Sequence, residues 1–161
     1  MAAAKWGQLP TGYYPLSVSA EWIALSAQDG RRWLARLDTP QNVVAELPQT
    51  CNEINIFASG QTVHVFARPG WRNAEGPMRY LFYDFARGAK PYCEKSLPWV
   101  RVVWDMAPET GIAIVNDNNR FWGRIWLLDL KTEKRKSISA AWPSLILKKE
   151  VAQRWIELSK P

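Results

Sequence analysis

Short runs of alternating apolar and polar residues recur along the chain, separated by turns that contain Gly, Pro, Asn and Asp. Runs of this kind predict short β-strands. The unit is clearest in residues 111–130, where the apolar run Gly111–Val115 and a second run that starts at Arg124 enclose the polar loop Asn116–Arg124. This layout is typical of a β-hairpin with a long connection. The sequence therefore predicts an all-β protein.

The predicted strands repeat in groups of four. First strands are expected at Tyr14–Ala20, Ile54–Phe57 and Val100–Trp104, and second strands at Trp22–Ala27, Thr62–Ala67 and Gly111–Val115. Third strands are expected to begin at Arg32, Arg79 and Arg124, and fourth strands to cover Asn42–Leu47, Tyr92–Leu97 and Lys136–Ala140. An apolar residue followed by proline recurs at Pro10, Pro48, Pro98 and Pro143. Proline donates no ladder hydrogen bond, so this position suits the end of an outer edge strand.

Four short strands in about 40–50 residues is the period of a β-propeller blade. The third repeat contains Ile125-Trp126-Leu127-Leu128-Asp129-Leu130-Lys131-Thr132-Glu133, which resembles the third strand and following turn of a TolB-like or WD-repeat-like blade. The resemblance covers most of Tyr14–Ala141 but includes no Gly-His…Trp-Asp pair and no Ser-Pro-Asp-Gly-Lys turn. It implies antiparallel four-stranded blades in a small β-propeller or propeller segment, and no activity.

The whole chain, 1–161, is expected to form one propeller-like domain of about 3.5–4 blades. Its repeats would cover about 11–48, 49–98 and 99–143, and the partial repeat 144–161 would close with residues 1–10. The alternative is a half-propeller completed by a second chain. Residues 144–159 also permit a helix, because Leu147, Val151, Trp155 and Leu158 share one helical face.

Composition adds ten tryptophans and a formal net charge of +6 to this picture. A positive charge favours acidic partners. No apolar run is long enough to span a membrane, and the first residues lack the apolar core of a secretory signal. As written, the sequence favours the cytoplasm, although a mature secreted protein given a new Met1 would look the same.

If the repeats are blades, the loops between second and third strands leave the sheets on one face, where binding residues usually gather. Together these loops carry seven arginines and three acidic residues. Arginine grips carboxylate or phosphate at two points and stacks on aromatic rings. The candidate binding residues, called the loop face below, are Arg31, Arg32, Arg68, Trp71, Arg72, Arg79, Arg120, Trp122 and Arg124. The structural alternative is that Arg32, Arg79 and Arg124 pair with neighbouring carboxylates while the two tryptophans cap the core.

No catalytic site, metal site or cofactor is predicted. His64 has no nucleophile placed beside it, so a structural or surface role is favoured over that of a catalytic base. Asp38, Asp84 and Asp129 are expected to bond the backbone of the next turn rather than to act as glycosidase carboxylates. The run Asn116–Asn119 lacks the closing Glu of a calcium loop and is expected to form a turn.

The remaining distinctive side chains are expected to be structural. Most tryptophans alternate with polar neighbours along strands and are expected in the core between blades; examples are Trp22, Trp33, Trp104 and Trp126. Cys51 precedes an inner strand and Cys93 lies in an outer strand. Three strand spacings would separate them by about 14 Å, beyond disulfide reach, so two free thiols are predicted.

These observations favour a non-catalytic interaction module that docks a macromolecule with an acidic surface on the loop face. Nucleic acid is less favoured, because the basic residues are few and no recognition motif is present. One alternative is a carbohydrate-binding or carbohydrate-active propeller that uses exposed Trp and Asp residues. Another is a structural subunit that completes a propeller with another chain, as in a homodimer.

Overall fold

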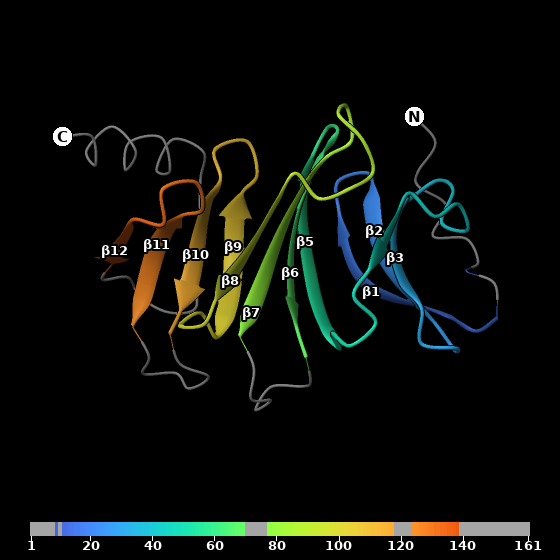
Figure 1. Cartoon of the computed structure of the whole chain (residues 1–161), viewed down its shortest axis with the longest axis horizontal. Helices are drawn as coiled ribbons and strands as arrows, with labels where there is room; N and C mark the ends of the chain where they lie inside the picture. Colours follow the sequence, from blue (N-terminus) through green and yellow to red (C-terminus); the bar gives the residue numbers. More distant parts are fainter. Residues whose placement is uncertain (1–8, 10, 70–76, 118–123, 139–161) are drawn as a thin grey trace. The chain divides into compact units, whose positions relative to one another are not determined.

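The described residues form twelve β-strands in three four-stranded antiparallel sheets (Figure 1). The computed structural model describes residues 9, 11–69, 77–117 and 124–138. The first sheet contains β1 (Tyr13–Ser19), β2 (Trp22–Ala27), β3 (Arg32–Arg36) and β4 (Ala45–Leu47). The second contains β5 (Glu53–Ser59), β6 (Thr62–Arg68), β7 (Met78–Asp84) and β8 (Cys93–Leu97). The third contains β9 (Val102–Ala107), β10 (Ile112–Asn116), β11 (Ile125–Asp129) and β12 (Arg135–Ile138).

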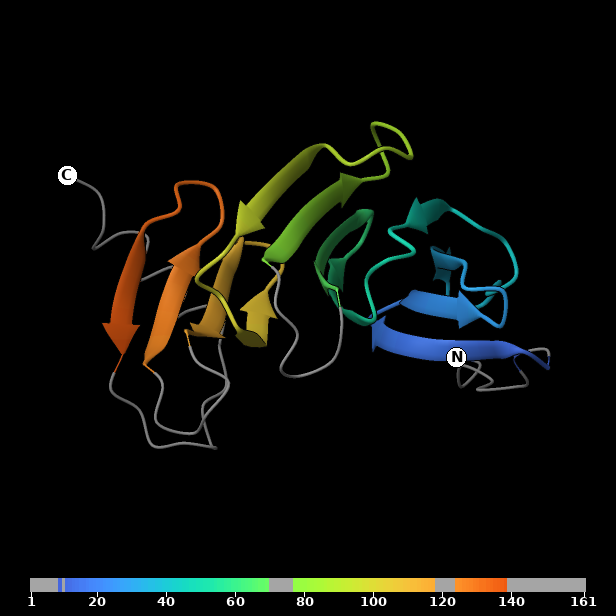
Figure 2. The same cartoon turned by 60° about the horizontal axis from the view of Figure 1, so that its bottom comes forward.

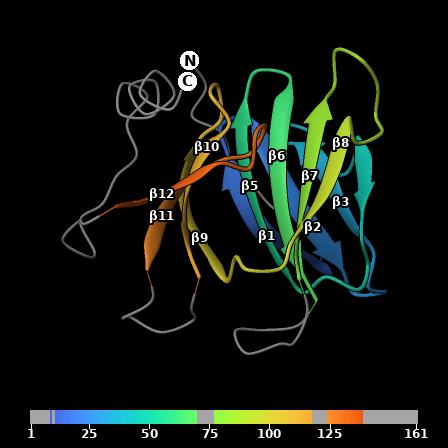
Figure 3. The same cartoon turned by 60° about the vertical axis from the view of Figure 1, so that its left-hand side comes forward.

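Every sheet is a meander in which strands adjacent in sequence are also neighbours in space. Figure 3 shows this order in the second sheet, where β5, β6, β7 and β8 lie side by side, and Figure 2 shows the third sheet, in yellow to red, from another direction. The prediction of three groups of four antiparallel strands is confirmed. β2 matches its predicted bounds, whereas β4 is shorter than the predicted Asn42–Leu47.

The chain divides into two compact units, residues 1–96 and 97–161. In the described part of the first unit, the first and second sheets pack on a shared core that includes Trp22 and Leu34 from one sheet and Val65, Leu81 and Tyr83 from the other. All five side chains are buried, so water is excluded from the packed faces of both sheets. The described part of the second unit consists of the third sheet and the chain that leads into it.

The first strands of the two packed sheets, β1 and β5, run side by side and in the same direction. The hydroxyl oxygen of Ser17 accepts a hydrogen bond from the Ile56 N–H at 3.0 Å, and that of Ser19 accepts one from the Ala58 N–H at 2.9 Å. A step of two residues on β1 thus matches a step of two on β5, which defines parallel strands.

A second cluster lies on the face of the first sheet opposite the shared core. Ile23, Leu25, Trp33 and Ala35 are buried there, and the ring of Tyr13 meets Trp33 edge to face. The indole N–H groups of both buried tryptophans find acceptors, since Trp22 donates to the Gly60 carbonyl at 2.9 Å and Trp33 donates to the Pro40 carbonyl at 3.1 Å. The predicted core placement of these two tryptophans is confirmed.

The third sheet has its own apolar cluster, formed by Ala107, Ile112, Ile114 and Leu127. Trp126 is half-buried, but Trp104 is 41% exposed, so its predicted core placement is wrong. The reason is a β-bulge: Val103 pairs with Val115 and Asp105 pairs with Ile114, so Trp104 is the extra residue of the bulge on β9. A bulge breaks the alternation of faces on which the prediction depended.

Two of the aspartates that follow third strands accept hydrogen bonds from the backbone of the next turn, as predicted. The Asp84 side chain accepts a hydrogen bond from the Ala86 N–H, and the Asp129 side chain accepts bonds from the N–H groups of Lys131 and Thr132. The backbone-bonding role is confirmed for these two residues. Asp38 is different, because its carboxylate accepts a hydrogen bond from the hydroxyl of Thr39 at 3.3 Å. The two cysteines are free, as predicted, with Cys51 buried and Cys93 half-buried.

Of the two terminal segments invoked for closure, residues 1–10 and 144–161, the structure describes only Leu9. The alternative helix over 144–159 also lies outside the described residues. No helix long and apolar enough to cross a membrane occurs in the part of the chain that is described.

Candidate functional site

Four of the loop-face arginines gather at one end of the first unit. Because β1 and β5 are parallel and both sheets are meanders, the β2–β3 and β6–β7 loops leave the sheets at the same end. Arg31, Arg32, Arg68 and Arg79 lie in or beside these loops. Arg124 belongs to the third sheet, immediately before β11. The other predicted members, Trp71, Arg72, Arg120 and Trp122, lie outside the described residues.

Three of these arginines are paired with glutamates on adjacent strands. Arg31 meets Glu46 at 2.6 Å and Arg68 meets Glu53 at 2.6 Å, and the third pair is Arg79 with Glu94. In each pair the two residues are fifteen positions apart. The sequence reasoning did not single out these glutamates, although each falls in a strand beside its arginine once the strands are aligned.

The accessible fractions of the paired side chains differ greatly. The Arg68 side chain is 2% exposed, the Arg79 side chain 36% and the Arg31 side chain 47%. Hydrogen bonding to Glu46 raises the pKa of Arg31, and hydrogen bonding to Glu94 raises the pKa of Arg79. Arg68 is therefore inaccessible to a partner, whereas Arg31 and Arg79 can still be reached.

Arg32 holds the connection between the first and second sheets. Its guanidinium donates to the carbonyl oxygens of Gly30 at 3.0 Å and Gln49 at 2.5 Å, and to the Asn52 side-chain oxygen at 2.9 Å. Asn52 itself donates its N–H to the Arg68 carbonyl at 3.1 Å. The structure thus gives Arg32 a scaffold role, as the structural alternative supposed, but with backbone carbonyls and an amide in place of a carboxylate.

The arginines that the sequence aligned as equivalent take different positions in the sheets. β3 begins at Arg32, but β7 begins at Met78 and β11 begins at Ile125, after Arg124. The prediction that every third strand begins with an arginine is confirmed only for β3. The strand pairing displaces only Arg32 among the three: Arg32 lies four residues before Arg36, which pairs with the first residue of β2. Arg79 and Arg124 lie five residues before Asp84 and Asp129, which pair with the first residues of β6 and β10. A shift of one residue moves a side chain to the other face of a sheet, so Arg32 is not equivalent to the other two.

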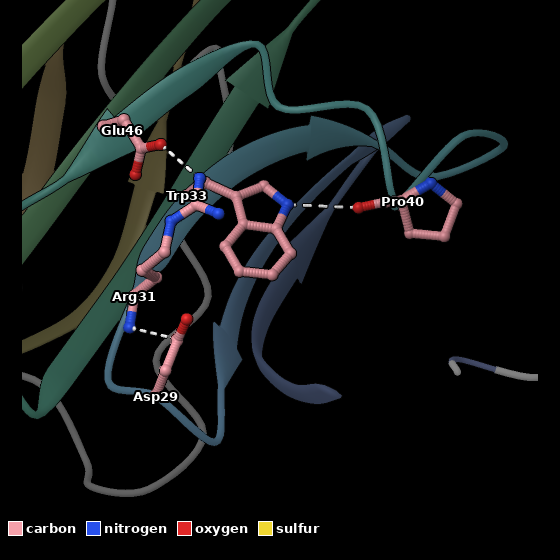
Figure 4. A network of polar contacts seen from close by, with 5 residues as sticks. All are labelled: Asp29, Arg31, Trp33, Pro40 and Glu46. Carbon is pink, nitrogen blue, oxygen red and sulfur yellow. Dashed lines mark hydrogen bonds and ion pairs between the residues drawn. The ribbon is translucent and has the colours of Figure 1, made fainter. Parts of the chain in front are cut away.

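Arg31 also contacts an aromatic ring (Figure 4). Its guanidinium carbon lies 5.7 Å from the ring centroid of Trp33, and its backbone N–H donates to the Asp29 carboxylate at 3.0 Å. The same guanidinium donates to Glu46, so Asp29, Trp33 and Glu46 together fix one arginine.

A second arginine–tryptophan group lies on the third sheet and was not predicted. The Arg135 guanidinium carbon is 4.3 Å from the ring centroid of Trp99 and 4.5 Å from that of Trp126. The indole N–H of Trp126 donates a hydrogen bond to one carboxylate oxygen of Asp117 at 3.3 Å. The other carboxylate oxygen of Asp117 accepts a hydrogen bond from the backbone N–H of Arg124 at 3.0 Å. The sequence spacing gave no signal for this group, because Trp99 and Arg135 are brought together only by the sheet.

His64 lies in a buried aromatic layer of the second sheet. Its Nδ1 atom is 2.7 Å from the Tyr80 hydroxyl, and its ring packs against Tyr80 and Phe82. Burial raises the pKa of Tyr80. The residue is 4% exposed, which agrees with the structural role expected for it and not with the surface one.

No group of three or more His, Cys, Asp or Glu residues that could hold a metal ion occurs among the described residues. No protein-family model, curated protein or solved structure matches the chain.

Proposed function

We propose that the chain is a non-catalytic interaction module that docks a macromolecular partner with an acidic surface at the loop end of its sheets. The observation that supports this most directly is the parallel placement of β1 and β5, since it collects arginines from two loops at one end of the first unit. Rigid strands then present adjustable loop side chains, which is a common arrangement for binding sites.

The burial of the side chains narrows the proposed site. Arg68 is enclosed and Arg32 is committed to the inter-sheet connection, so both serve the scaffold. Arg31 and Arg79 remain partly open, and their glutamate partners are about half exposed. Exposed ion pairs contribute little to stability, so a carboxylate of a partner can replace Glu46 or Glu94 without a large cost.

The finer fold proposed for this module is a β-propeller segment. Three meander sheets of four strands, a repeat of about 40–50 residues and a core shared by two sheets with parallel first strands are the relationships expected between neighbouring blades. A fourth, partial blade formed by residues 144–161 with 1–10 remains part of the proposal.

The experiment is a titration of the full chain with poly-L-glutamate at several salt concentrations, measured by calorimetry. An Arg31→Glu, Arg79→Glu variant is expected to bind at least tenfold more weakly than the unchanged chain, and the affinity of the unchanged chain is expected to fall with salt. The matched control is Arg87→Glu, because Arg87 is 63% exposed and follows β7 at the opposite end of the sheet. Equal weakening in the control would overturn the proposed site.

Carbohydrate binding is a second candidate, because large aromatic rings are exposed. Tyr92 is 63% exposed, Tyr14 52% and Trp104 41%. Quenching of tryptophan fluorescence by sugars that persists at high salt would favour this candidate over an anionic partner.

A third candidate is a structural subunit whose sheets are completed by another chain or a second copy. The edge strands of the described sheets are β1, β4, β5, β8, β9 and β12. Strand edges present backbone groups that can pair. A stable monomer at micromolar concentration would exclude the homodimer.

A further inference from the structure

Two tryptophans of the third sheet form a corner around a cation. The ring centroids of Trp99 and Trp126 are 6.4 Å apart and the rings stand at 77° to each other. The Arg135 guanidinium lies at nearly equal distances from both, 4.3 and 4.5 Å. Aromatic faces carry negative charge density and attract cations within about 6 Å, so both walls of the corner act on the same group.

The two walls are positioned by contacts that do not involve Arg135. Trp126 lies in β11, where it pairs with Val115 on one side and Ser137 on the other. Trp99 lies in the segment before β9, which is held by hydrogen bonds from the Val100 N–H to the Leu97 carbonyl and from the Arg101 N–H to the Asn116 carbonyl. The corner is therefore expected to persist when its occupant is removed.

Asp117 makes the corner more favourable for a positive charge. One carboxylate oxygen accepts the Trp126 indole N–H at 3.3 Å, and the other accepts the Arg124 N–H at 3.0 Å. A carboxylate bound at the edge of an indole adds negative potential to the ring face.

The Arg135 guanidinium, which now lies between the two tryptophans, can be displaced by another cation. Arg135 is exposed at the start of the edge strand β12, and within the described residues it forms no ion pair. The other arginine–tryptophan pair behaves differently, because Arg31 is bound to Glu46 and Trp33 is only 3% exposed. Trp99 and Trp126 are both half-buried, so part of each ring can be reached.

We propose that the Trp99–Trp126 corner is a binding site for a guanidinium group of an external ligand, and that Arg135 is an internal occupant that competes for it. The proposal goes beyond the docking of an acidic partner, because it concerns residues of the third sheet and a ligand of the opposite charge. Removing Arg135 would then expose the site, and the apparent affinity would rise by a factor equal to the reciprocal of the fraction of time for which the site is open in the unchanged chain.

The test uses the full chain with N-acetylarginine amide as the probe, followed by tryptophan fluorescence. Arg135→Gln is expected to bind the probe roughly tenfold more tightly than the unchanged chain does, since the internal competitor is gone. Lys136→Gln is the matched control, because Lys136 is the next basic residue on β12 and pairs with Leu127, so it lies on the other face of the sheet. The control is expected to bind like the unchanged chain.

Two further variants make the result decisive. Trp99→Ala in the Arg135→Gln background is expected to abolish binding, and Arg135→Ala serves as a second opened variant if the glutamine side chain fills the corner. Binding of N-acetyllysine amide as tight as that of the arginine probe would overturn the guanidinium assignment. Equal affinities of the unchanged chain and both opened variants, or no binding by any of them, would overturn the site.

One more comparison shows whether the bound guanidinium group comes from a protein partner or from a small molecule. A neutral peptide with a single arginine that binds more tightly than the amide assigns the guanidinium to a protein partner. Equal affinities assign it to a small guanidinium compound. An effect of Arg135→Gln on this probe is independent of poly-L-glutamate binding, so the two proposals can fail separately.

Discussion

The hydroxyl of Ser17 accepts a hydrogen bond from the backbone N–H of Ile56 at 3.0 Å, across the junction between two sheets. Ser19 repeats the contact with Ala58 at 2.9 Å. Strand edges normally meet through a ladder of backbone groups, but here side-chain oxygens of β1 satisfy the edge N–H groups of β5. The junction is thus specified by side chains and is sensitive to single substitutions.

Replacing both serines by alanine should destabilise the first unit. Each change leaves a partly buried N–H without its acceptor, and the cost of such a loss is about 1 kcal/mol. We expect Ser17→Ala, Ser19→Ala to lower the free energy of unfolding by about 2 kcal/mol, measured by urea denaturation. Ser96→Ala is the control, because Ser96 is exposed on β8. A loss no larger than that of the control would contradict the role assigned to the hydroxyls.

Ala20→Gly should stabilise the chain. Ala20 has φ of 51°, and Gly60 has φ of 57° in the corresponding two-residue connection between β5 and β6. An alanine with positive φ is strained and glycine is not, so the expected gain is about 0.5–1 kcal/mol after the extra flexibility of the unfolded chain is counted.

The reverse change, Gly60→Ala, tests the same argument. No heavy atom outside residues 59–61 lies within 4 Å of the added methyl group, so the whole cost is expected to come from the backbone. Unfolding by heat should show opposite shifts of Tm for the two variants. Shifts of the same sign would contradict the explanation from φ.

Alkaline pH should weaken the first unit through Tyr83. Burial, with a contribution from Glu94, raises the pKa of this phenol to about 12. The neutral phenol is favoured in the folded chain, so its contribution is complete below about pH 10, the pKa of a tyrosine in an unfolded chain, and is lost as the pH rises towards 12. The slope for one group is at most about 1.4 kcal/mol per pH unit.

Tyr83→Phe should reduce the loss of folding stability at alkaline pH, as measured by urea denaturation at a series of pH values. Tyr80, whose pKa is also raised by burial, accounts for a further part. Tyr14→Phe is the control, because Tyr14 is 52% exposed. An unchanged dependence of stability on alkaline pH in Tyr83→Phe would contradict the role assigned to the buried phenol.

Arg32→Ala should destabilise the fold, because Arg32 has a structural role and not a binding role. The change removes the hydrogen bonds to Gln49 and Asn52 and is expected to cost about 2 kcal/mol of unfolding free energy. Amide hydrogen exchange of residues 48–52 should become faster, since the connection loses its anchor. Arg124→Ala, at an exposed position, should change neither measurement. Arg32→Lys is not expected to restore the contacts, because lysine lacks the planar fork.

The strands were predictable from the sequence because each one pairs with its neighbour in the chain. The apolar run Trp22–Ala27 located β2 to the residue, and the turns of Asp84 and Asp129 followed from the local chemistry of aspartate. Local patterns are sufficient for such features, since the partners are only a few residues away.

Side-chain positions were harder to predict because they depend on register. The bulge at Trp104 reverses the expected face, and the one-residue offset of Arg32 from Arg79 and Arg124 breaks the expected equivalence of the three arginines. The corner formed by Trp99 and Trp126 joins two segments that no sequence spacing relates. Bulges and offsets of one residue leave little trace in composition or periodicity, yet they decide where a side chain points.

The meander order of the sheets has a kinetic consequence. Every backbone ladder of the described chain joins neighbouring strands, so each sheet needs only contacts between residues close in sequence. Chains with such local contacts fold faster than those that must first close long loops. The first sheet can therefore assemble during synthesis as soon as Leu47 has left the ribosome, and it then offers Ser17 and Ser19 as a template on which β5 aligns.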